Sequence, residues 1–129
     1  MNKTILIVDD DPITIHLLKL MLKPFGFNIF TARNGVEALA QTEANKPDLI
    51  LLDVMMPMMD GFTVCKRLRA KASTQDVPIL ILSTSALRDS IQKGMRAGAT
   101  KYLFKPIKRE SLLQEVAGAL HLTPSLLSA

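Results

Sequence analysis

Four charged residues stand at the ends of apolar runs, where a buried chain does not place a charge without a partner or a task. Asp9 and Asp10 follow the run ILIV, Asp53 follows LILL, and Lys105 follows YLF. Carboxylates that lie close together repel one another. They favour a hard cation such as Mg²⁺ (or Mn²⁺), because such ions prefer oxygen ligands.

Asp53 is the candidate for covalent chemistry, because a carboxylate can act as a nucleophile and form an acyl phosphate. A lysine and a hydroxyl can hold the oxygens of a transferred phosphoryl group. The chain offers Lys105 and, directly after the apolar run PILIL, the three hydroxyl residues Ser83, Thr84 and Ser85. The residue types therefore predict a phosphoryl-accepting aspartate beside a divalent cation.

These residues can meet only if the chain folds as a parallel sheet. Five short runs rich in Ile, Leu and Val predict buried strands at 4–8, 28–32, 49–52, 78–82 and 101–104. Amphipathic stretches between them predict five helices, beginning after Asp11, Asn34 and Gly61 and spanning roughly 86–97 and 109–121. Alternating strands and helices predict helices on both faces of one sheet. In such sheets the active crevice borders the carboxyl ends of the strands.

Apolar spacing along each helix predicts its inward face. In the first helix, which Asp11 caps and Pro24 ends, the inward residues are expected to be Ile13, Leu17, Leu20 and Met21. In the second helix they are expected to be Val36, Leu39 and Ala40. In the third and fifth helices they are expected to be Val64, Cys65, Leu68, Leu112, Leu113, Val116 and Leu120.

Composition sets the class of protein. The 129 residues are 48% hydrophobic and 22% charged, which is typical of one globular domain. We expect a domain over 1–122, with 123–129 as a tail or the start of a linker. The single cysteine, Cys65, cannot form an internal disulfide, which favours a reducing cytoplasm. No apolar stretch approaches the roughly 20 residues of a membrane helix, so no membrane partner is expected.

Four segments closely resemble the receiver domain of two-component response regulators, over about residues 3–121. They are ILIVDDD, LILLDVMMPMMDG, PILILSTSA and AGATKYLFKP. The resemblance implies an α/β fold of the flavodoxin-like, doubly wound kind. Its five-stranded parallel sheet has the order 2-1-3-4-5 and five flanking helices.

The resemblance also implies roles for single residues. Asp53 would accept a phosphoryl group from a phosphohistidine on a sensor histidine kinase or a histidine phosphotransfer protein. Asp10, Asp53 and the backbone carbonyl of Met55 would bind Mg²⁺ directly, and Asp9 would bind it through water. Ser83 and Lys105 would hold phosphoryl oxygens, the latter from a cis Lys105–Pro106 peptide.

The implied output is a conformational switch of a signalling protein rather than turnover of a substrate. Ser83 would move toward the phosphoryl group and leave space for Tyr102. Thr84 and Ser85 would control access of water, and autodephosphorylation would be slow. A downstream protein or a second copy would bind the face of the fourth helix, fifth strand and fifth helix. The basic segment 86–110 favours an acidic protein partner there, with no direct binding of nucleic acid.

Three other interpretations remain for the same pattern. The chain is expected either to act alone or to be a receiver domain excised from a larger regulator or hybrid kinase. A flavin-binding electron carrier of similar topology would need a glycine- and hydroxyl-rich phosphate loop after the first strand, where this chain has DDDP. A phosphohydrolase with an aspartyl phosphate would carry a second acid where Met55 stands.

Overall fold

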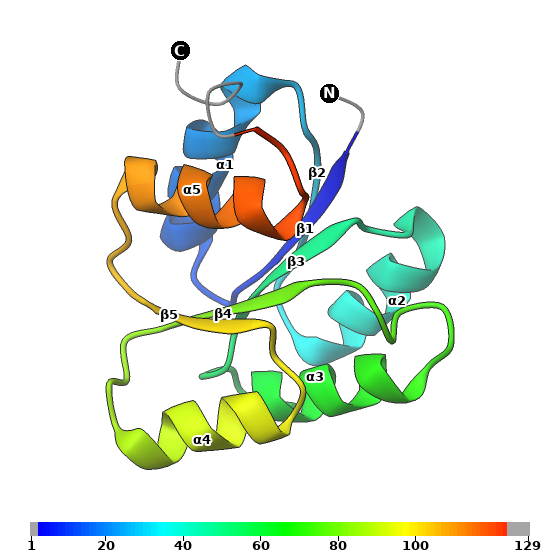
Figure 1. The fold of residues 1–129 in the computed structure, drawn as a ribbon. Coiled ribbons are helices and arrows are strands. Elements are labelled where there is room, and N and C mark those ends of the chain that lie inside the picture. Colours follow the sequence, from blue (N-terminus) through cyan, green and yellow to red (C-terminus); the bar gives the residue numbers. More distant parts are fainter. Residues whose placement is uncertain (1–2, 124–129) are drawn as a thin grey trace.

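A five-stranded parallel sheet forms the middle layer of the computed structural model, which describes residues 3–123 (Figure 1). The strands are β1 (Thr4–Val8), β2 (Asn28–Ala32), β3 (Leu49–Asp53), β4 (Ile79–Ser83) and β5 (Lys101–Phe104). Their spatial order is β2-β1-β3-β4-β5, and every neighbouring pair is parallel. The flavodoxin-like order expected from the sequence is therefore confirmed, and β1, β3 and β4 occupy the interior of the sheet.

The helices form the two outer layers, as Figure 1 shows. One face of the sheet is covered by α1 (Pro12–Leu22), which continues into the 3-10 turn η1 (Lys23–Phe25), and by α5 (Arg109–Ala119). The other face is covered by α2 (Gly35–Asn45), α3 (Gly61–Ala70) and α4 (Arg88–Arg96). Within residues 3–123 no helix is long and apolar enough to cross a membrane.

The sheet divides the core into two apolar clusters. Along β1, Ile5 and Ile7 pack under α1 and α5, whereas Leu6 and Val8 pack under α2 and α3. Adjacent strands do the same, which explains why their sequences are uninterrupted apolar runs. Fully burying each such side chain stabilises the fold by about 1.5–3 kcal/mol. The buried interior strands therefore fix the positions of the residues that follow their carboxyl ends.

The first helix begins and ends as its sequence predicts. The carboxylate of Asp11 accepts a hydrogen bond from the backbone N–H of Ile13 at 3.0 Å and another from the Thr14 hydroxyl at 2.8 Å. These contacts satisfy N-terminal groups that would otherwise lack partners. The helix ends at Leu22, because Pro24 lies in η1 and Gly26 follows with a φ of 76°. Asp11 is thus a helix cap.

The predicted inward face of α1 was wrong. The side chains of Ile13, Leu17 and Leu20 are 68%, 50% and 55% exposed, and the buried residues of the helix are Ile15, Leu18 and Leu22. Both sets have the spacing of a helical stripe, so periodicity alone could not choose between them. Only Met21 of the predicted set packs partly against the core.

The inward face of α2 also differs from the prediction. Val36 is 64% exposed and Ala40 is exposed, whereas Ala38 and Thr42 are buried and Leu39 is partly buried. The small Ala38 lets α2 lie close to the sheet, so bulk was a poor guide to burial here. For α3 and α5 every predicted inward residue is buried.

Candidate functional site

Three carboxylates meet where β1 and β3 end. Because Val8 of β1 pairs with Leu52 of β3, the residues that follow them, Asp9 and Asp53, lie side by side. Asp9 and Asp53 are only 2% and 5% exposed, and Asp10 lies exposed beside them. One oxygen from each of the three residues lies within 4.8 Å of the others. The cluster expected from the sequence is therefore formed.

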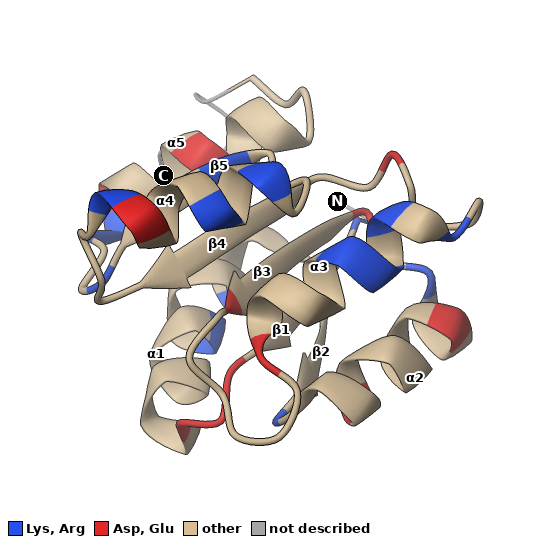
Figure 2. Cartoon of the chain, turned by 90° about the horizontal axis from the view of Figure 1, so that it is seen from below, with Lys and Arg blue, Asp and Glu red and all other residues tan. Residues whose placement is uncertain are grey.

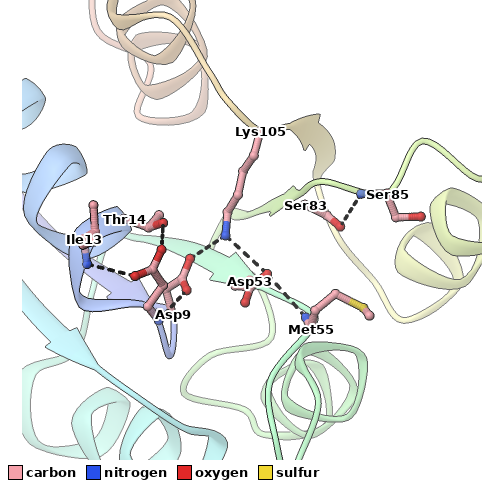
Figure 3. Close-up of polar contacts among 9 residues, drawn as sticks. Asp9, Ile13, Thr14, Asp53, Met55, Ser83, Ser85 and Lys105 are labelled. Carbon is pink, nitrogen blue, oxygen red and sulfur yellow. Dashed lines mark hydrogen bonds and ion pairs between the residues drawn. The ribbon is translucent and has the colours of Figure 1, made fainter.

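Lys105 closes the site from the end of β5 (Figure 3). Its ammonium lies 2.6 Å from Oδ2 of Asp9 and 3.5 Å from Oδ1 of Asp53. The backbone N–H of Lys105 donates to the carbonyl of Ser83 at 2.8 Å, which holds the end of β5 beside the end of β4. The Lys105–Pro106 peptide is cis, as expected. A residue 96 positions from Asp9 is thus brought into direct contact with it.

The surroundings of Asp53 disfavour its negatively charged form. Burial raises the pKa of Asp53, and the charge of Asp9 raises it further, although Lys105 and the Met55 N–H act in the opposite direction. For Lys105, burial lowers the pKa, but the hydrogen bond to Asp9 and the charges of both acids outweigh it, so the pKa is raised. One ammonium therefore serves two buried carboxylates and remains protonated.

The donor set fits a hard divalent cation. All three side chains offer carboxylate oxygens, which Mg²⁺ prefers, and the single lysine does not balance their charge. The thioether of Met55 is a soft group that points away from the cluster, and the backbone N–H of Met55 lies 3.3 Å from Oδ1 of Asp53 (Figure 3). The residues present are therefore those that a magnesium site requires.

The loop between β3 and α3 can approach Asp53 because residue 61 has no side chain. A Cβ at Gly61 would overlap the carbonyl oxygen of Asp53 and lie 2.6 Å from the Cα of Val54. The N–H of Gly61 donates to the Val54 carbonyl at 3.1 Å, and Asp60 caps α3 through the N–H of Thr63 at 2.9 Å. The Asp-Gly pair of the motif thus starts α3 directly behind the buried carboxylate.

A second polar network begins at the end of β4. The fully buried Ser83 hydroxyl accepts a hydrogen bond from the N–H of Ser85 at 3.1 Å. The carbonyl of Ser85 accepts one from the Tyr102 hydroxyl at 2.9 Å. The Ser85 hydroxyl lies 3.1 Å from that of Ser90 in α4. The structure therefore joins Ser83, Ser85 and Tyr102, and it adds Ser90, which sequence patterns did not single out because the contact depends on how α4 is placed.

Thr84 lies on the side of the site next to α1. It is exposed and borders an apolar groove of about 350 Å³ between α1 and the segment that follows β5. The groove is lined by Thr14, Leu17, Leu18, Met21, Leu82, Thr84, Lys105, Pro106 and Ile107. Thr84 and Ser85 are adjacent in sequence but serve different surroundings, since Ser85 belongs to the network that leads to α4.

Comparison with known proteins places the chain among signalling domains. Residues 5–117 match the family model described as the response regulator receiver domain. The protein PilH of Pseudomonas aeruginosa is 36% identical over 116 residues, which cover 90% of this chain and 96% of that protein. The DNA-binding dual master transcriptional regulator RpaA of Synechocystis is 42% identical over 120 residues, which cover 92% of this chain and 49% of that protein. The chain spans about half the length of several curated relatives that it matches.

A solved structure matches the fold. It is the crystal structure of the receiver domain of a sensor histidine kinase from Pseudomonas aeruginosa, with a magnesium ion coordinated in its active site cleft. The identity is 29% and the TM-score 0.87, over 94% of this chain and 99% of that one.

Proposed function

The chain belongs to the response regulator receiver domain family, and we propose that it is a signalling phosphoacceptor whose Asp53 takes a phosphoryl group from a phosphohistidine. The donor is a sensor histidine kinase or a histidine phosphotransfer protein. The observation that carries the proposal is the buried Asp53 carboxylate, within reach of Asp9, Asp10 and Lys105. The buried, reduced Cys65 fits a cytoplasmic location for such a protein.

Each residue of the site has a task in the transfer. A carboxylate oxygen of Asp53 attacks phosphorus while the bond from phosphorus to the donor imidazole nitrogen breaks, so an acyl phosphate forms. Lys105 shares its ammonium between Asp9 and Asp53 and can turn to an oxygen of the incoming group. A divalent cation held by Asp9, Asp10 and Asp53 would offset the negative charge of the phosphoryl oxygens.

Ser83 is placed to respond to the new group. Its hydroxyl is buried at the end of the strand next to β3, and its present partner is the N–H of Ser85. We propose that the hydroxyl turns from this contact to a phosphoryl oxygen. The change would then reach Tyr102 and α4, because both are hydrogen-bonded to Ser85.

The test of the acceptor is direct. Incubation with acetyl phosphate and Mg²⁺, followed by mass spectrometry of the peptides, should place one phosphoryl group on Asp53. Chelation of the metal should abolish the label. Asp53→Asn should abolish it too, whereas the matched variant Asp11→Asn should keep it, because asparagine also caps a helix and Asp11 lies outside the cluster. Full labelling of Asp53→Asn would contradict the proposal.

The donor protein is proposed to cover α1. A phosphohistidine can reach Asp53 only if its protein lies over the rim of the crevice. On that rim α1 exposes Ile13, Leu17 and Leu20, and Leu17 also lines the apolar groove beside Lys105. Apolar side chains grouped on an exposed helix indicate a surface that a partner buries. We therefore propose an apolar contact between α1 and the donor.

The output partner is proposed to bind the face of α4, β5 and α5. Figure 2 shows Lys and Arg positions in blue along the ribbon of α4, where Arg88, Lys93 and Arg96 are exposed. Lys101 of β5 is paired with Glu115 of α5 at 2.9 Å, so the excess positive charge belongs mainly to α4. This surface suits an acidic protein segment or a second copy of the chain, whose approach the charge would steer.

The output surface can be tested with beryllofluoride, which mimics a phosphoryl group on Asp53. Sedimentation or pull-down with and without the mimic should show a dimer or partner that Tyr102→Ala and Lys101→Glu weaken. Lys23→Glu, in η1 beside β2 at the opposite edge of the sheet from β5, is the matched control and should have no effect. Equal binding by all three variants would place the output elsewhere.

Loss of the phosphoryl group is proposed to be slow. The exposed Met55 stands beside Asp53, and a thioether is too weak an acceptor to orient an attacking water. Thr84 borders the neighbouring apolar groove, which Lys105 also lines. Met55→Asn should speed decay of the labelled protein by offering an amide to the water. Unchanged decay in Met55→Asn and in Thr84→Ala would show that neither side chain limits the attack.

A further inference from the structure

The geometry of α4 does not itself require a glycine, yet Gly94 lies within this helix. Gly94 is the only residue of Arg88–Arg96 that is buried. A glycine within a helix costs about 1 kcal/mol relative to alanine. The position must therefore serve a contact with another element.

That contact is with the ring of Tyr102. A Cβ added to Gly94 would lie 3.0 Å from Cδ2 and 3.4 Å from Cε2 of Tyr102, and 2.9 Å from Cδ1 of Ile81. The ring packs against the apolar cluster beneath α2 and α3, and the Phe104 ring lies 5.6 Å away between centroids. The bare backbone of Gly94 thus forms one wall of a space that the tyrosine fills.

The hydroxyl end of the tyrosine is held as well. It donates to the carbonyl of Ser85 at 2.9 Å. Ser85 is fixed in turn, because its N–H donates to Ser83 and its hydroxyl accepts from the N–H of Leu87 at 3.3 Å and contacts Ser90. Ring and hydroxyl are therefore seated together while the Ser83 hydroxyl is still bonded to Ser85.

We infer that Gly94 and the Ser85 carbonyl form a preformed seat that holds Tyr102 inward before any phosphoryl group is present. Phosphorylation would then change the contact between Ser83 and Ser85 beneath a tyrosine that is already in place. Much of the surface of α4 and β5 would therefore already have its phosphorylated shape before phosphorylation. This regulation rests on the proposed function, but the position of the ring can be measured without a phosphoryl group.

The experiment uses the only tyrosine of a chain that has no tryptophan, so its fluorescence reports on residue 102 alone. In the full chain without metal or mimic, the lifetime-corrected quenching constant for acrylamide should be several-fold below that of the urea-unfolded chain. Adding Mg²⁺ and beryllofluoride should change it little. Gly94→Ala should raise it several-fold, because the new methyl group would lie 3.0 Å from the ring edge, which is closer than ordinary van der Waals contact, and would press the ring outward.

Gly118→Ala is the matched control, since a Cβ at Gly118 in α5 would meet nothing within 4 Å. It should leave the quenching constant unchanged. The inference would be overturned if the quenching constant of the wild type without beryllofluoride equalled that of the unfolded chain and fell only when beryllofluoride was added. It would also be overturned by a folded Gly94→Ala whose tyrosine stays shielded. The wild-type measurement decides the resting position even if Gly94→Ala does not fold. Failure of the phosphoacceptor proposal would instead appear as unlabelled Asp53.

Discussion

The two helices on either side of the crevice, α1 and α4, are attached to the sheet in different ways. α1 buries Ile15, Leu18 and Leu22 in the core and still exposes an apolar stripe. α4 buries only Gly94 and exposes mainly charged and polar side chains. One helix is held by apolar burial, whereas the other is held largely by hydrogen bonds at its ends.

The difference predicts which helix opens more easily. Displacing α1 would expose three large apolar side chains, at about 1.5–3 kcal/mol each. The first turn of α4 is tied mainly through Ser85 and Ser90, and its C-terminal end through Arg69, whose Nε donates to the carbonyl of Gly98 at 2.8 Å. Elements with little buried apolar area open at the lowest free energy. We therefore expect α4 to open locally at a lower free energy than α1, first at its N-terminal end.

The largest expected effect tests how α1 is anchored. Leu18→Ala should lower the free energy of unfolding by about 2–5 kcal/mol, because it leaves a cavity in the core. Leu17→Ala, one residue away and half exposed, should cost less than about 1 kcal/mol. Urea unfolding of both variants measures the pair. Equal losses would show that the two stripes of α1 are not distinct.

Hydrogen exchange should separate the two helices in the wild type. Amides in the first turn of α4 should exchange at least about ten times faster than those in the middle of α1, because α4 can open locally. Amides near Arg96, close to the Arg69 contact, should be intermediate. Equal protection of α1 and α4 by mass spectrometry or NMR would contradict a mobile α4.

A charge on α1 should block the donor and not the chemistry. Leu17→Glu should slow transfer from a phosphorylated histidine phosphotransfer protein by about tenfold, which corresponds to about 1.4 kcal/mol of lost contact. Labelling by acetyl phosphate should be unchanged, since that donor needs no protein surface. Leu87→Glu, an equally apolar residue that is 71% exposed at the start of α4, is the control. If Leu87→Glu slows transfer as much as Leu17→Glu does, the donor protein does not contact α1 in preference to α4.

The smallest expected effect is on the pH dependence of stability, which should differ between Asp53 in the crevice and Asp11 at the start of α1. The native pKa of Asp53 is raised above its ordinary value of 3.8, so the native state binds this proton more tightly than the unfolded chain. The contribution of Asp53 to stability without metal should therefore fall as pH rises from about 4 toward neutrality, and Asp53→Asn should gain stability relative to the wild type over the same range.

The pKa of Asp11 is shifted in the opposite direction from that of Asp53. The native pKa of Asp11 is lowered, chiefly by the hydrogen bonds from Thr14 and Ile13, so its contribution is present above 3.8 and is lost as pH falls. Asp11→Asn should therefore lose a little stability at neutral pH. Urea titrations of both variants from pH 7 to below 3.8 measure the contrast. A parallel response of the two variants would show that the crevice does not disfavour the charge of Asp53.

Much of the site could be predicted from the sequence because local patterns encode it. Strands buried on both faces must be apolar at every position, so β1, β3 and β4 were visible as uninterrupted runs. A charge directly after such a run must lie at the edge of the sheet. Asp9 and Asp53 were placed by that rule, and the family motifs supplied the strand order that brings them together.

The inward faces of α1 and α2 could not be predicted in the same way. In α1 two apolar stripes have equal spacing, and in α2 the small Ala38 lies inward while Val36 does not. Which stripe faces the sheet depends on the direction in which the chain leaves β1 and on the neighbouring α5. Those are properties of packing between distant segments, which no window of neighbouring residues contains.

Several contacts in and around the site were decided by tertiary structure alone. Lys105 divides its charge between Asp9 and Asp53, Ser90 meets Ser85, and Gly94 admits the ring of Tyr102. Each contact joins residues from different elements at distances of a few ångströms. The amino-acid order determines which residue types are available and which strand ends carry them. The relative placement of packed elements determines which of several similar hydroxyls, glycines and charges come into contact, because hydrogen bonds and van der Waals contacts act only over that short range.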